Sequence, residues 1–547
     1  MPGSPLDDLR AAVRGAAADV AEGDHPAGAR LTLERPKRAD FGDYSTNAAL
    51  LLAPVVKAPP RAVADRLAAA LQARLGAGVD RVEVAGPGFL NVFLSDAWYA
   101  GAVAELLAAG EAYGAGAPAE PQRVLIEFVS ANPTGPLTAA SGRHAAYGDA
   151  LARLLAFAGH GVEREYYFND SGSQMLRLGE SIRARARGDE PPEDGYQGAY
   201  VADLAARIPD AADADADPAE LGRRGGELVM EGIRRTLDAY GVHFDHWFLE
   251  RSLQEGSPSE LERALERLEE RGHLYRSEGA LWLRTTAFGD DKDRVLERSS
   301  GEPTYFASDV AYHEDKLERG FDRLINPLGA DHHGYVPRMR AALAALGADP
   351  DRLEIPILQF VHIVEGRQRA SMSKRRGDFI TLDDLIAEIG VDATRFFMLQ
   401  RSHESTVDLD LALAREQSNE NPVYYVQYAH ARIASLLDRA GAERVAAALA
   451  AGGASGEALH PAERELVRKL LAFPAEVADA ANRRAPHRMA AYALELAQVF
   501  TAFYRDCRVV GAEPEATESF RLALSVATRR VIARALGLLG VSAPESM

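Results

Sequence analysis

Two loops in this sequence combine residue types that suit phosphate chemistry. The first, Asn132-Pro-Thr-Gly-Pro136, lies between a short apolar run and a helical pattern. A Gly/Pro loop that leads from a parallel strand into a helix exposes backbone N–H groups and the positive end of the helix, which together attract phosphate. Because every strand–helix junction has this general form, an ordinary connection is the competing interpretation.

The second loop, Met372-Ser-Lys-Arg-Arg-Gly377, is cationic and ends in glycine. The chain has 62 Lys and Arg residues, and Lys374 is one of only six lysines among them. Cationic side chains beside a phosphate chain neutralise the charge that develops during phosphoryl or nucleotidyl transfer. A solvated basic turn has the same composition, and spacing alone does not separate the two interpretations.

The segments around these loops alternate between strand and helix. Short β-rich runs predict strands at Val124–Val129 and Val162–Phe168, with later candidates at Leu324–Leu328 and Ile355–Val361, and a helical pattern covers Pro337–Leu346. This alternation predicts an α/β fold with a parallel, doubly wound sheet, in which ligands bind beyond the carboxyl ends of the strands.

Changes of pattern along the chain predict three domains. Residues 1–112 have the pattern of an α+β module, residues 113–390 hold the alternating strands and helices, and residues 391–547 are all helical without strand signals. Within the middle domain, the Gly/Pro/Ala-rich segment 113–122 predicts a linker. The acidic, low-complexity insertion at about 188–220 predicts a second, solvated linker.

The composition excludes several classes of protein. One cysteine, Cys507, among 547 residues rules out a disulfide framework and a thiolate zinc cluster. A net charge of −19 argues against a protein coated with nucleic acid, although the Arg-studded tail is compatible with polyanion contact at one end. The N-terminus lacks the features of a signal peptide, and no uncharged apolar run reaches the roughly 18 residues that a membrane span requires. We therefore expect a soluble protein of the reducing cytoplasm.

Several longer strings occur in order along nearly the whole chain. They are Ser130-Ala-Asn-Pro-Thr-Gly-Pro-Leu137, Tyr166-Tyr-Phe-Asn-Asp-Ser-Gly172, Tyr305-Phe-Ala-Ser-Asp-Val-Ala-Tyr-His313, Gly329-Ala-Asp-His-His-Gly-Tyr335 and Asn421-Pro-Val-Tyr-Tyr-Val-Gln-Tyr-Ala-His430. Together with the two loops, they resemble the class I aminoacyl-tRNA synthetases and, within that class, the bacterial arginyl-tRNA synthetases.

The resemblance implies a Rossmann-like catalytic domain, an N-terminal tRNA-contacting module and an all-α, anticodon-binding helical bundle. It implies that the chain forms arginyl-adenylate from ATP and L-arginine and passes the arginyl group to the 3′-terminal ribose of tRNA(Arg). It further implies a cytoplasmic monomer that uses Mg²⁺ bound to the phosphates of ATP, no protein-bound zinc, and adenylate formation that requires bound tRNA.

The resemblance places arginine binding on Glu127, Asn132, Tyr305 and Asp309. A guanidinium group is planar with five donors, so its selection over lysine calls for carboxylates and carbonyl-type acceptors at fixed angles. Glu127 is a charge in an otherwise apolar strand, and Tyr305 and Asp309 are four residues apart, on one face of a helix. Each residue also has a structural explanation, such as a salt-bridged glutamate or an Asx turn at Asn132.

The resemblance assigns ATP binding to eight positions: Pro133, Ala140, Gly329, Asp331, His332, Met372, Ser373 and Lys374. Lys374 is expected to be the chief electrostatic group, and Asp331 to lie near the ribose. The adjacent His332 and His333 invite a metal interpretation, but no third ligand is evident, which favours adenosine contact or packing by His332.

The first signature departs from the family pattern. Class I enzymes usually have His-x-Gly-His at the helix start, where this chain has Thr138-Ala-Ala-Ser141. The hydroxyls of Thr138 and Ser141 donate hydrogen bonds, but they are uncharged. The expected catalytic residues are Lys374, Thr138 and Ser141. His144 lies one turn after Ser141 on the same helix face, and we hypothesise that it supplies the imidazole that the signature lacks and is a fourth catalytic residue. A packing or surface histidine is the competing interpretation.

In the helical tail, Tyr424, Tyr425 and Tyr428 are candidates for stacking on unpaired anticodon bases. Arg483, Arg484 and Arg488 form the best local basic cluster for tRNA phosphates. Aromatic side chains stack on unpaired bases of single-stranded RNA, and arginines contact phosphates. Tyrosines at this spacing also occur in helix cores. The alternative for the whole chain is a catalytically inactive relative that binds arginine or tRNA, and the replacement at 138–141 is its support.

Overall fold

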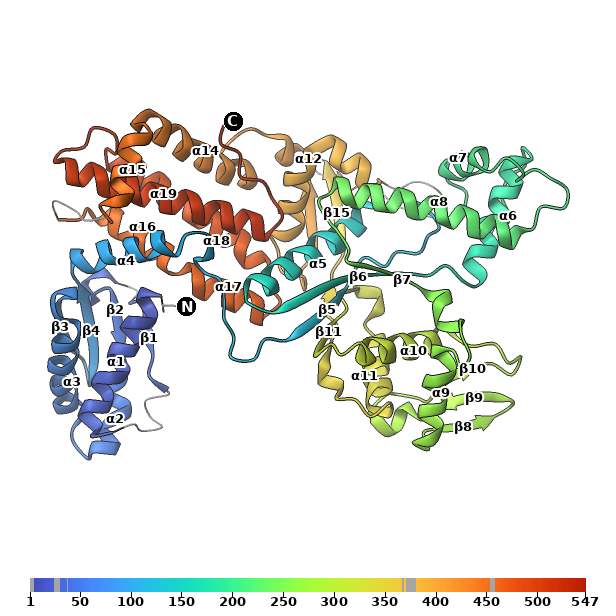
Figure 1. Ribbon diagram of the computed structural model, residues 1–547, viewed down its shortest axis with the longest axis horizontal. Helices are drawn as coiled ribbons and strands as arrows, with labels where there is room; N and C mark the ends of the chain where they lie inside the picture. The colour runs from blue at the N-terminus through green and yellow to red at the C-terminus, as the bar shows by residue number, and fades with distance from the viewer. Residues whose placement is uncertain (1–3, 24–29, 37, 366–367, 370–379, 453–457) are drawn as a thin grey trace.

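The computed structural model describes residues 4–23, 30–36, 38–365, 368–369, 380–452 and 458–547. Figure 1 shows an N-terminal module, a central sheet, two lobes that project from the sheet, and a C-terminal helical bundle. In the described part of the chain, no helix is long and apolar enough to cross a membrane.

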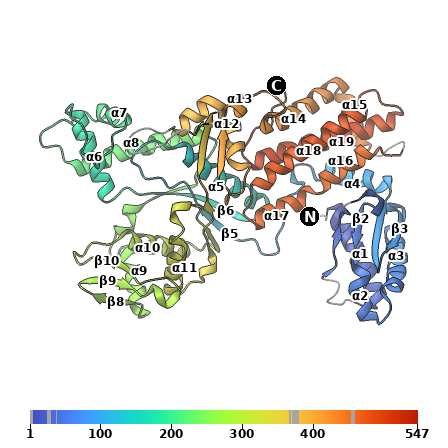
Figure 2. The same ribbon diagram turned by 180° about the vertical axis from the view of Figure 1, so that it is seen from behind.

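The N-terminal module is a four-stranded antiparallel sheet with helices packed against it. The strand order is β1-β2-β4-β3, with β1 (Leu33–Glu34), β2 (Tyr44–Thr46), β3 (Val79–Ala85) and β4 (Phe89–Leu94), and the helices are α1 (Pro5–Ala21), α2 (Ala48–Val56), α3 (Pro60–Leu75) and α4 (Asp96–Ala109). The module is tied to the helical bundle, because Arg468 Nη1 lies 2.7 Å from Asp43 Oδ1. Figure 2 shows the two units side by side from behind.

The central sheet has five parallel strands and confirms the predicted fold class. Its order is β13-β11-β5-β6-β7, with β5 (Arg123–Glu127), β6 (Gly161–Phe168), β7 (His246–Leu249), β11 (Arg323–Ile325) and β13 (Leu353–Glu354). Both faces are covered: Val124 and Ile126 pack in the core that includes α5 (Ala139–Phe157), and Leu125 packs in the core that includes α10 (Tyr305–Glu318). A strand buried on both faces accounts for the unbroken apolar run.

The first lobe lies between β6 and β7 in the chain. It consists of α6 (Ser173–Ala186), α7 (Tyr200–Arg207) and α8 (Pro218–Ala239). The prediction of a solvated linker over 188–220 is therefore wrong for α7, because Val201 and Leu204 are buried against the neighbouring helices. A second lobe combines α9 (Glu260–Glu270) with an antiparallel sheet of β8 (Leu274–Ser277), β9 (Ala280–Leu283) and β10 (Arg294–Glu297).

Two further expectations are wrong in the second half of the sheet region. The predicted strand 355–361 is split, because β14 (Ile357–Leu358) pairs with β12 (Leu328–Gly329) and β15 (Val361–Glu365) pairs with β17 (Val407–Asp410). β17 lies in the region predicted to be all helical, where buried Val407 and Leu409 alternate with two aspartates. This four-residue alternation is too short to stand out from the helical pattern around it.

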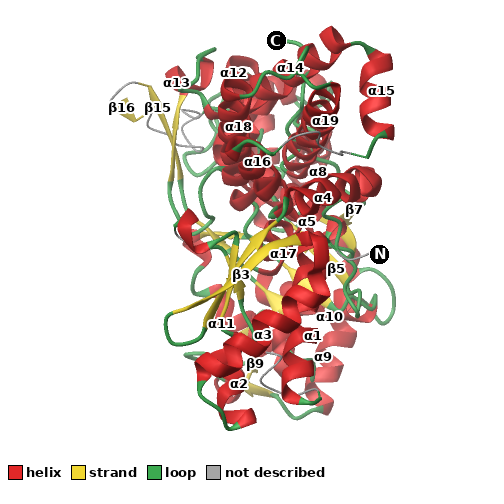
Figure 3. Ribbon diagram, turned by 90° about the vertical axis from the view of Figure 1, so that its left-hand side faces the viewer, coloured by secondary structure: helices red, strands yellow, loops and turns green. Residues whose placement is uncertain are grey.

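The helical bundle contains α14 (Pro422–Ala440), α15 (Ala442–Ala450), α16 (Pro461–Leu471), α17 (Phe473–Asn482), α18 (His487–Asp506) and α19 (Glu515–Leu538), as Figure 3 shows. The predicted boundary at 390/391 falls inside α12 (Leu382–Leu399), at a kink where Gly390 has φ 79°. Fully buried Arg395 of α12 pairs with Asp149 of α5 and donates to the carbonyls of Tyr240 and Leu539. One guanidinium thus joins α5, the first lobe and the end of the chain.

Candidate active site

A cavity of about 470 Å³ lies at the carboxyl ends of β5 and β11. Nine residues predicted from the sequence line it: Glu127, Asn132, Ala140, Ser141, His144, Asp309, Gly329, Asp331 and His332. These residues come from four separate strings of the sequence, and the parallel sheet brings them together at the edge where such folds bind ligands. We call the part around Glu127 and Asp309 the carboxylate end, and the part around Ser141, His144 and Gly329 the hydroxyl end.

A strained corner separates β5 from the loop that follows. Val129 and Ser130 have φ values of 68° and 38°, although neither is glycine. A β-branched residue in the left-handed region costs about 1–3 kcal/mol, and such strain clusters at functional sites. The Ser130 hydroxyl stabilises the corner, because it donates to Glu127 Oε1 at 3.0 Å and accepts from the Tyr167 amide at 3.1 Å. The corner also explains why β5 ends two residues before the predicted Val129.

Glu127 is held by donors from three elements. Oε1 accepts from Ser130, and Oε2 accepts from Lys316 Nζ at 2.6 Å and from Asn326 Nδ2 at 3.0 Å. The Glu127 side chain is 12% exposed and that of Lys316 is 0% exposed. A buried carboxylate with a cation and two further donors is satisfied and fixed in orientation. The predicted structural alternative for Glu127, a salt bridge, is therefore present at the edge of the cavity.

Asp309 is the second carboxylate of the carboxylate end. Burial raises the pKa of Asp309 to about 7, while a hydrogen bond from the Tyr335 hydroxyl opposes that shift. The carboxylates of Glu127 and Glu250 raise the pKa further, and the ammonium of Lys316 lowers it. A cationic ligand beside Asp309 would favour its ionised form, since an opposite charge stabilises the carboxylate.

The hydroxyl end is built on the first turn of α5. Thr138 is the N-cap of α5 and accepts a hydrogen bond from the Ser141 amide at 3.3 Å, and the two side-chain oxygens lie 3.2 Å apart. Backbone hydrogen bonds join this turn to the residues that follow the second signature: Ala139 N donates to Ile380 O at 3.0 Å, and Leu382 N donates to Leu137 O at 2.9 Å. The first signature is therefore joined by backbone hydrogen bonds to Ile380 and Leu382, which follow the second signature in the chain.

His144 faces the cavity, as the helical spacing predicts, and its ring donates a hydrogen bond to the Pro327 carbonyl. Burial, followed by the neighbouring Arg143, lowers the pKa of His144 to about 4. The imidazole is therefore neutral at physiological pH, and its second ring nitrogen is an acceptor. A neutral ring of this kind orients a ligand, but it does not supply the positive charge of a protonated signature histidine.

Gly329 marks a close approach at the same end of the cavity. A Cβ at this position would lie 2.7 Å from Asp331 Oδ1 and 4.0 Å from His144 Nε2. Glycine therefore leaves room for a ligand to pack against the backbone. His332 is exposed beside Asp331, with His332 Nε2 3.6 Å from Asp331 Oδ2.

Some predicted residues lie outside this cavity. Thr138, Pro133 and Tyr305 do not line it, and Tyr305 is 47% exposed at the start of α10. Met372, Ser373 and Lys374, together with Ser371, Arg375 and Arg376, lie outside the described residues.

The predicted tRNA-binding tyrosines have different surroundings. Tyr425 is directed into the bundle, where its hydroxyl bonds with Thr501 Oγ1 at 3.1 Å. Tyr428 stacks on Tyr424 with ring centroids 5.9 Å apart, and the guanidinium of Arg432 lies 4.6 Å from the Tyr428 ring centroid. Tyr428 therefore belongs to an aromatic and cationic strip, whereas Tyr425 serves packing.

The three predicted arginines do not form one basic cluster. Arg484 is bound to both carboxylate oxygens of Glu354, at 2.8 and 2.9 Å, and therefore joins the bundle to β13. Arg488 pairs with Glu476 at 2.7 Å. Only Arg483, whose side chain is 67% exposed, retains the open position that a phosphate contact needs among these three described residues. Arg484 and Arg488 are thus held by carboxylates of the chain, and their contact with tRNA stays a prediction.

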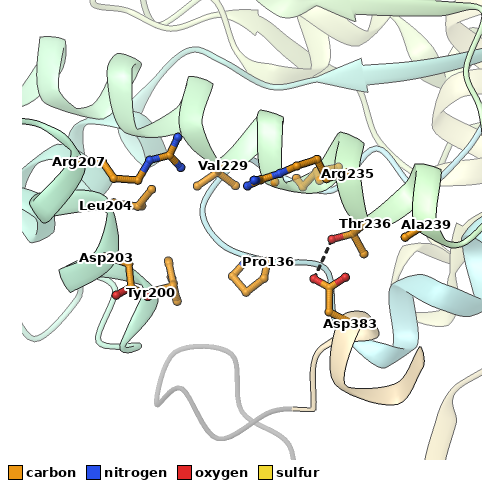
Figure 4. Close-up of a pocket in the computed structure, with 12 residues that line it drawn as sticks. Pro136, Tyr200, Asp203, Leu204, Arg207, Val229, Arg235, Thr236, Ala239 and Asp383 are labelled. Atoms are coloured by element: carbon orange, nitrogen blue, oxygen red, sulfur yellow. Dashed lines mark hydrogen bonds between the residues drawn. The ribbon is translucent and has the colours of Figure 1, made fainter. Parts of the chain in front are cut away.

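A second cavity of about 440 Å³ lies between the first lobe and the first loop (Figure 4). Pro136 faces this cavity with Tyr200 of α7 and Val229 of α8. The Tyr200 hydroxyl donates to the Thr134 carbonyl at 2.7 Å, and the Thr236 hydroxyl donates to Asp383 at 2.8 Å. The lobe thereby braces both the first loop and the helix that follows the second signature.

One group of described residues, Glu163, Glu165 and His246, has the spacing of metal ligands. Arg319 already occupies Glu165, with its two terminal nitrogens 2.7 and 2.9 Å from the two carboxylate oxygens. The positive charge that balances the buried carboxylate of Glu165 is therefore supplied by Arg319.

Sequence reasoning missed the residues that orient Glu127. Lys316 is one of the six lysines, and it lies on the helix of Tyr305 and Asp309, seven residues after Asp309. Its rarity and its place on that helix are signals that mark the residue, but they do not reveal its partner Glu127. Asn326 carries no such signal, because its role depends on how β5 and β11 pair. Ser130 acts through the corner that follows β5, which the sequence pattern does not show.

Comparison with known proteins gives a consistent result along the chain. Family models match for the arginyl tRNA synthetase N terminal domain over residues 7–94, the class I (R) tRNA synthetase catalytic domain over residues 227–433, and the DALR anticodon binding domain over residues 426–547. The chain is 47% identical to the arginine–tRNA ligase of Frankia alni over 561 residues, which cover 100% of each chain.

Solved structures agree with these matches. A putative arginyl-tRNA synthetase from Campylobacter jejuni superposes with a TM-score of 0.76 at 33% identity, covering 83% of this chain and 100% of that chain. The arginyl-tRNA synthetase of Thermus thermophilus superposes with a TM-score of 0.75 at 26% identity, covering 98% of this chain and 100% of that chain.

Proposed function

The chain belongs to the arginyl-tRNA synthetase family, and from this premise we propose how its residues serve the two steps of arginine–tRNA ligation. In the first step, a carboxylate oxygen of L-arginine attacks the α-phosphorus of MgATP. The bond from that phosphorus to the β-phosphate oxygen breaks, and pyrophosphate leaves. In the second step, the arginyl group passes from the adenylate to the 3′-terminal ribose of tRNA(Arg), and AMP is released.

We assign the carboxylate end of the cavity to the arginine side chain. Glu127 and Asp309 present carboxylates to a guanidinium group, and Asn132 adds an amide. Charge-assisted hydrogen bonds to a planar fork select arginine over the point charge of lysine. We also assign Tyr305, which lies at the start of the same helix as Asp309, to recognition of the arginine side chain.

We assign the hydroxyl end to MgATP. The first turn of α5 offers the positive end of the helix dipole and the hydroxyl of Ser141, and Gly329 leaves space for the adenosine. Lys374, on the second signature, is proposed to stabilise the charge that develops on the phosphates. No protein nucleophile is needed, since positioning and electrostatic stabilisation are sufficient for this chemistry.

The observation that carries the proposal is the meeting of both ends in one cavity of about 470 Å³. The remaining family expectations are proposals as well: a cytoplasmic monomer, tRNA contact by the N-terminal module, adenylate formation that requires tRNA, and anticodon contact by Tyr428 and Arg483.

Arginine-dependent exchange of pyrophosphate into ATP, measured with and without bulk tRNA, tests the proposal. Exchange that requires tRNA and is lost in Lys374→Ala is expected. A folded protein that binds arginine or tRNA without any exchange would instead be the inactive relative, and the hydroxyls at 138 and 141 would then mark lost catalysis.

A further inference from the structure

We propose that Lys316 is a specificity-determining positioning residue, which holds Glu127 by one carboxylate oxygen so that the other faces the guanidinium group of arginine. This inference rests on the proposed function of the carboxylate end. Lys316 itself does not line the cavity, so it acts through Glu127.

The contacts of Lys316 fix both its position and its direction. Its Nζ lies 2.6 Å from Glu127 Oε2, 3.4 Å from Asn326 Oδ1 and 4.0 Å from the centre of the Tyr312 ring. The side chain is completely buried, so its charge is satisfied within the fold. An ammonium group is a compact charge, and of the two Glu127 oxygens it donates a hydrogen bond to Oε2. Oε1 accepts the Ser130 hydroxyl and keeps a second lone pair for a ligand.

Arg319 shows what a different cation does one turn later on the same helix. Its guanidinium takes both oxygens of Glu165, at 2.7 and 2.9 Å, and Glu165 does not line the cavity. Arginine is by far the commoner cation in this chain, yet position 316 is a lysine. A fork at 316 that bound Glu127 as Arg319 binds Glu165 would donate to Oε1 as well as to Oε2. Because Oε1 already accepts the Ser130 hydroxyl, it would then have no lone pair left for the substrate.

Lys316 also fixes the direction in which Glu127 presents its charge. Among the described residues, Lys316 is the cation within salt-bridge distance of the Glu127 carboxylate. Without it, Oε2 would lose that partner, and the carboxylate would be free to turn away from the angle at which Oε1 meets a guanidinium N–H group. The charge-assisted contact that distinguishes a guanidinium from a urea group would then weaken, so L-citrulline, the uncharged isostere of arginine, would compete better.

The test is a double-mutant cycle in the full-length protein with bulk tRNA. We expect Lys316→Met to raise the KM for arginine about 30-fold, because this is the size of effect expected when one partner of a buried charge pair is removed. The kcat and the KM for ATP should change less than about threefold. We expect the arginine-to-citrulline ratio of kcat/KM to fall at least about tenfold. The double variant Glu127→Gln/Lys316→Met should be no worse than Glu127→Gln alone, because Lys316 acts through Glu127.

Arg319→Met is the matched control, since it removes a partly buried, salt-bridged cation at the C-cap of the same helix, outside the cavity. It should lower stability without changing the arginine-to-citrulline ratio. An equal fall of that ratio in Arg319→Met, or KM effects of Glu127→Gln and Lys316→Met that multiply, would overturn the proposal. If Lys316→Met does not fold, Lys316→Arg is used in its place. We expect Lys316→Arg to raise the KM for arginine, because the fork would block Oε1, and an unchanged KM in that variant would contradict the proposal.

An inactive wild-type protein would reject the proposed function instead.

Discussion

The two ends of the active-site cavity hold their polar groups in different ways. At the carboxylate end, Glu127 is fixed by Lys316 and Asn326, which lie about 190 and 199 residues away in the chain. At the hydroxyl end, Thr138 and Ser141 are neighbours on one helical turn, and the groups they offer are uncharged. The first arrangement needs the assembled sheet, whereas the second needs only a capped helix.

This contrast reflects what each end must do. Selection of a guanidinium group requires charges at fixed angles, and buried charges are tolerated only with partners that are also fixed. A phosphate chain is bound by helix N–H groups that every α-helix provides, so the side chains there are free to vary. The loss of both signature histidines with retention of the arginine-binding residues is consistent with that difference.

The largest effect should follow from removing a charge at the carboxylate end. Asp309→Asn should lower kcat/KM for arginine by about 30- to 1,000-fold, because loss of one partner of a buried charge pair costs about 2–4 kcal/mol. The KM for ATP should be unchanged, as pyrophosphate exchange would measure. Asp315→Asn is the matched control on the same helix, since Asp315 pairs with Arg319 outside the cavity. A similar loss in both variants would mean that α10, and not the carboxylate, is the source of the effect.

The same residue predicts a pH dependence confined to arginine. Because the pKa of Asp309 is raised to about 7 in the free protein, the carboxyl group is increasingly protonated below pH 7. The kcat/KM for arginine should therefore fall up to about tenfold per pH unit below 7, while that for ATP should not follow it.

Calorimetry in two buffers with different ionisation enthalpies should show proton release when arginine binds at about pH 7. In the free protein, this raised pKa contributes stability below the pKa of the unfolded chain, and the contribution is lost as the pH rises through 7. The charged or titratable groups that face Asp309 are Glu127, Glu250, Lys316 and Tyr335. Lys316 and Tyr335 oppose the shift, but the pKa of Asp309 remains raised, so the direction of the pH dependence is unchanged. Asp309→Asn should abolish the acid limb, and persistence of the limb in that variant would assign it to another group.

At the hydroxyl end, the expected effect is smaller. His144→Ala should slow arginine activation about tenfold, as expected for one hydrogen-bonding group in a partly buried site. No change of rate between pH 5 and 8 should be traceable to His144, since its pKa is lowered to about 4. His160, which lies after the C-terminal end of the same helix and away from the cavity, is the control position. An unchanged rate in His144→Ala would remove the residue from the mechanism.

The sequence predicted local and strand-edge features well and long-range partners poorly. The strand before Asn132, the helix after Thr138 and the shared face of Tyr305 and Asp309 follow from periodicity and capping, and the structure confirms them. The salt bridge of Arg484 with Glu354 and that of Lys316 with Glu127 depend on which elements pack together, so no local pattern reveals them. The acidic composition around 188–220 hid α7, because that helix is anchored by only three buried apolar residues, Val201, Leu204 and Ala205, within an acidic segment.

The smallest predicted effect concerns the brace between the first lobe and the first loop. Tyr200→Phe removes the hydroxyl that donates to the Thr134 carbonyl, and one such hydrogen bond is worth about 0.5–1.5 kcal/mol. We expect the KM for ATP to rise about two- to fivefold with little change in the KM for arginine, since the loop leads into the hydroxyl end. Tyr196→Phe is the control, because the Tyr196 hydroxyl makes no hydrogen bond among the described residues. If Tyr200→Phe instead changed the KM for arginine and left that for ATP unaltered, the lobe would support the carboxylate end, and the separation between the two ends would have to be abandoned.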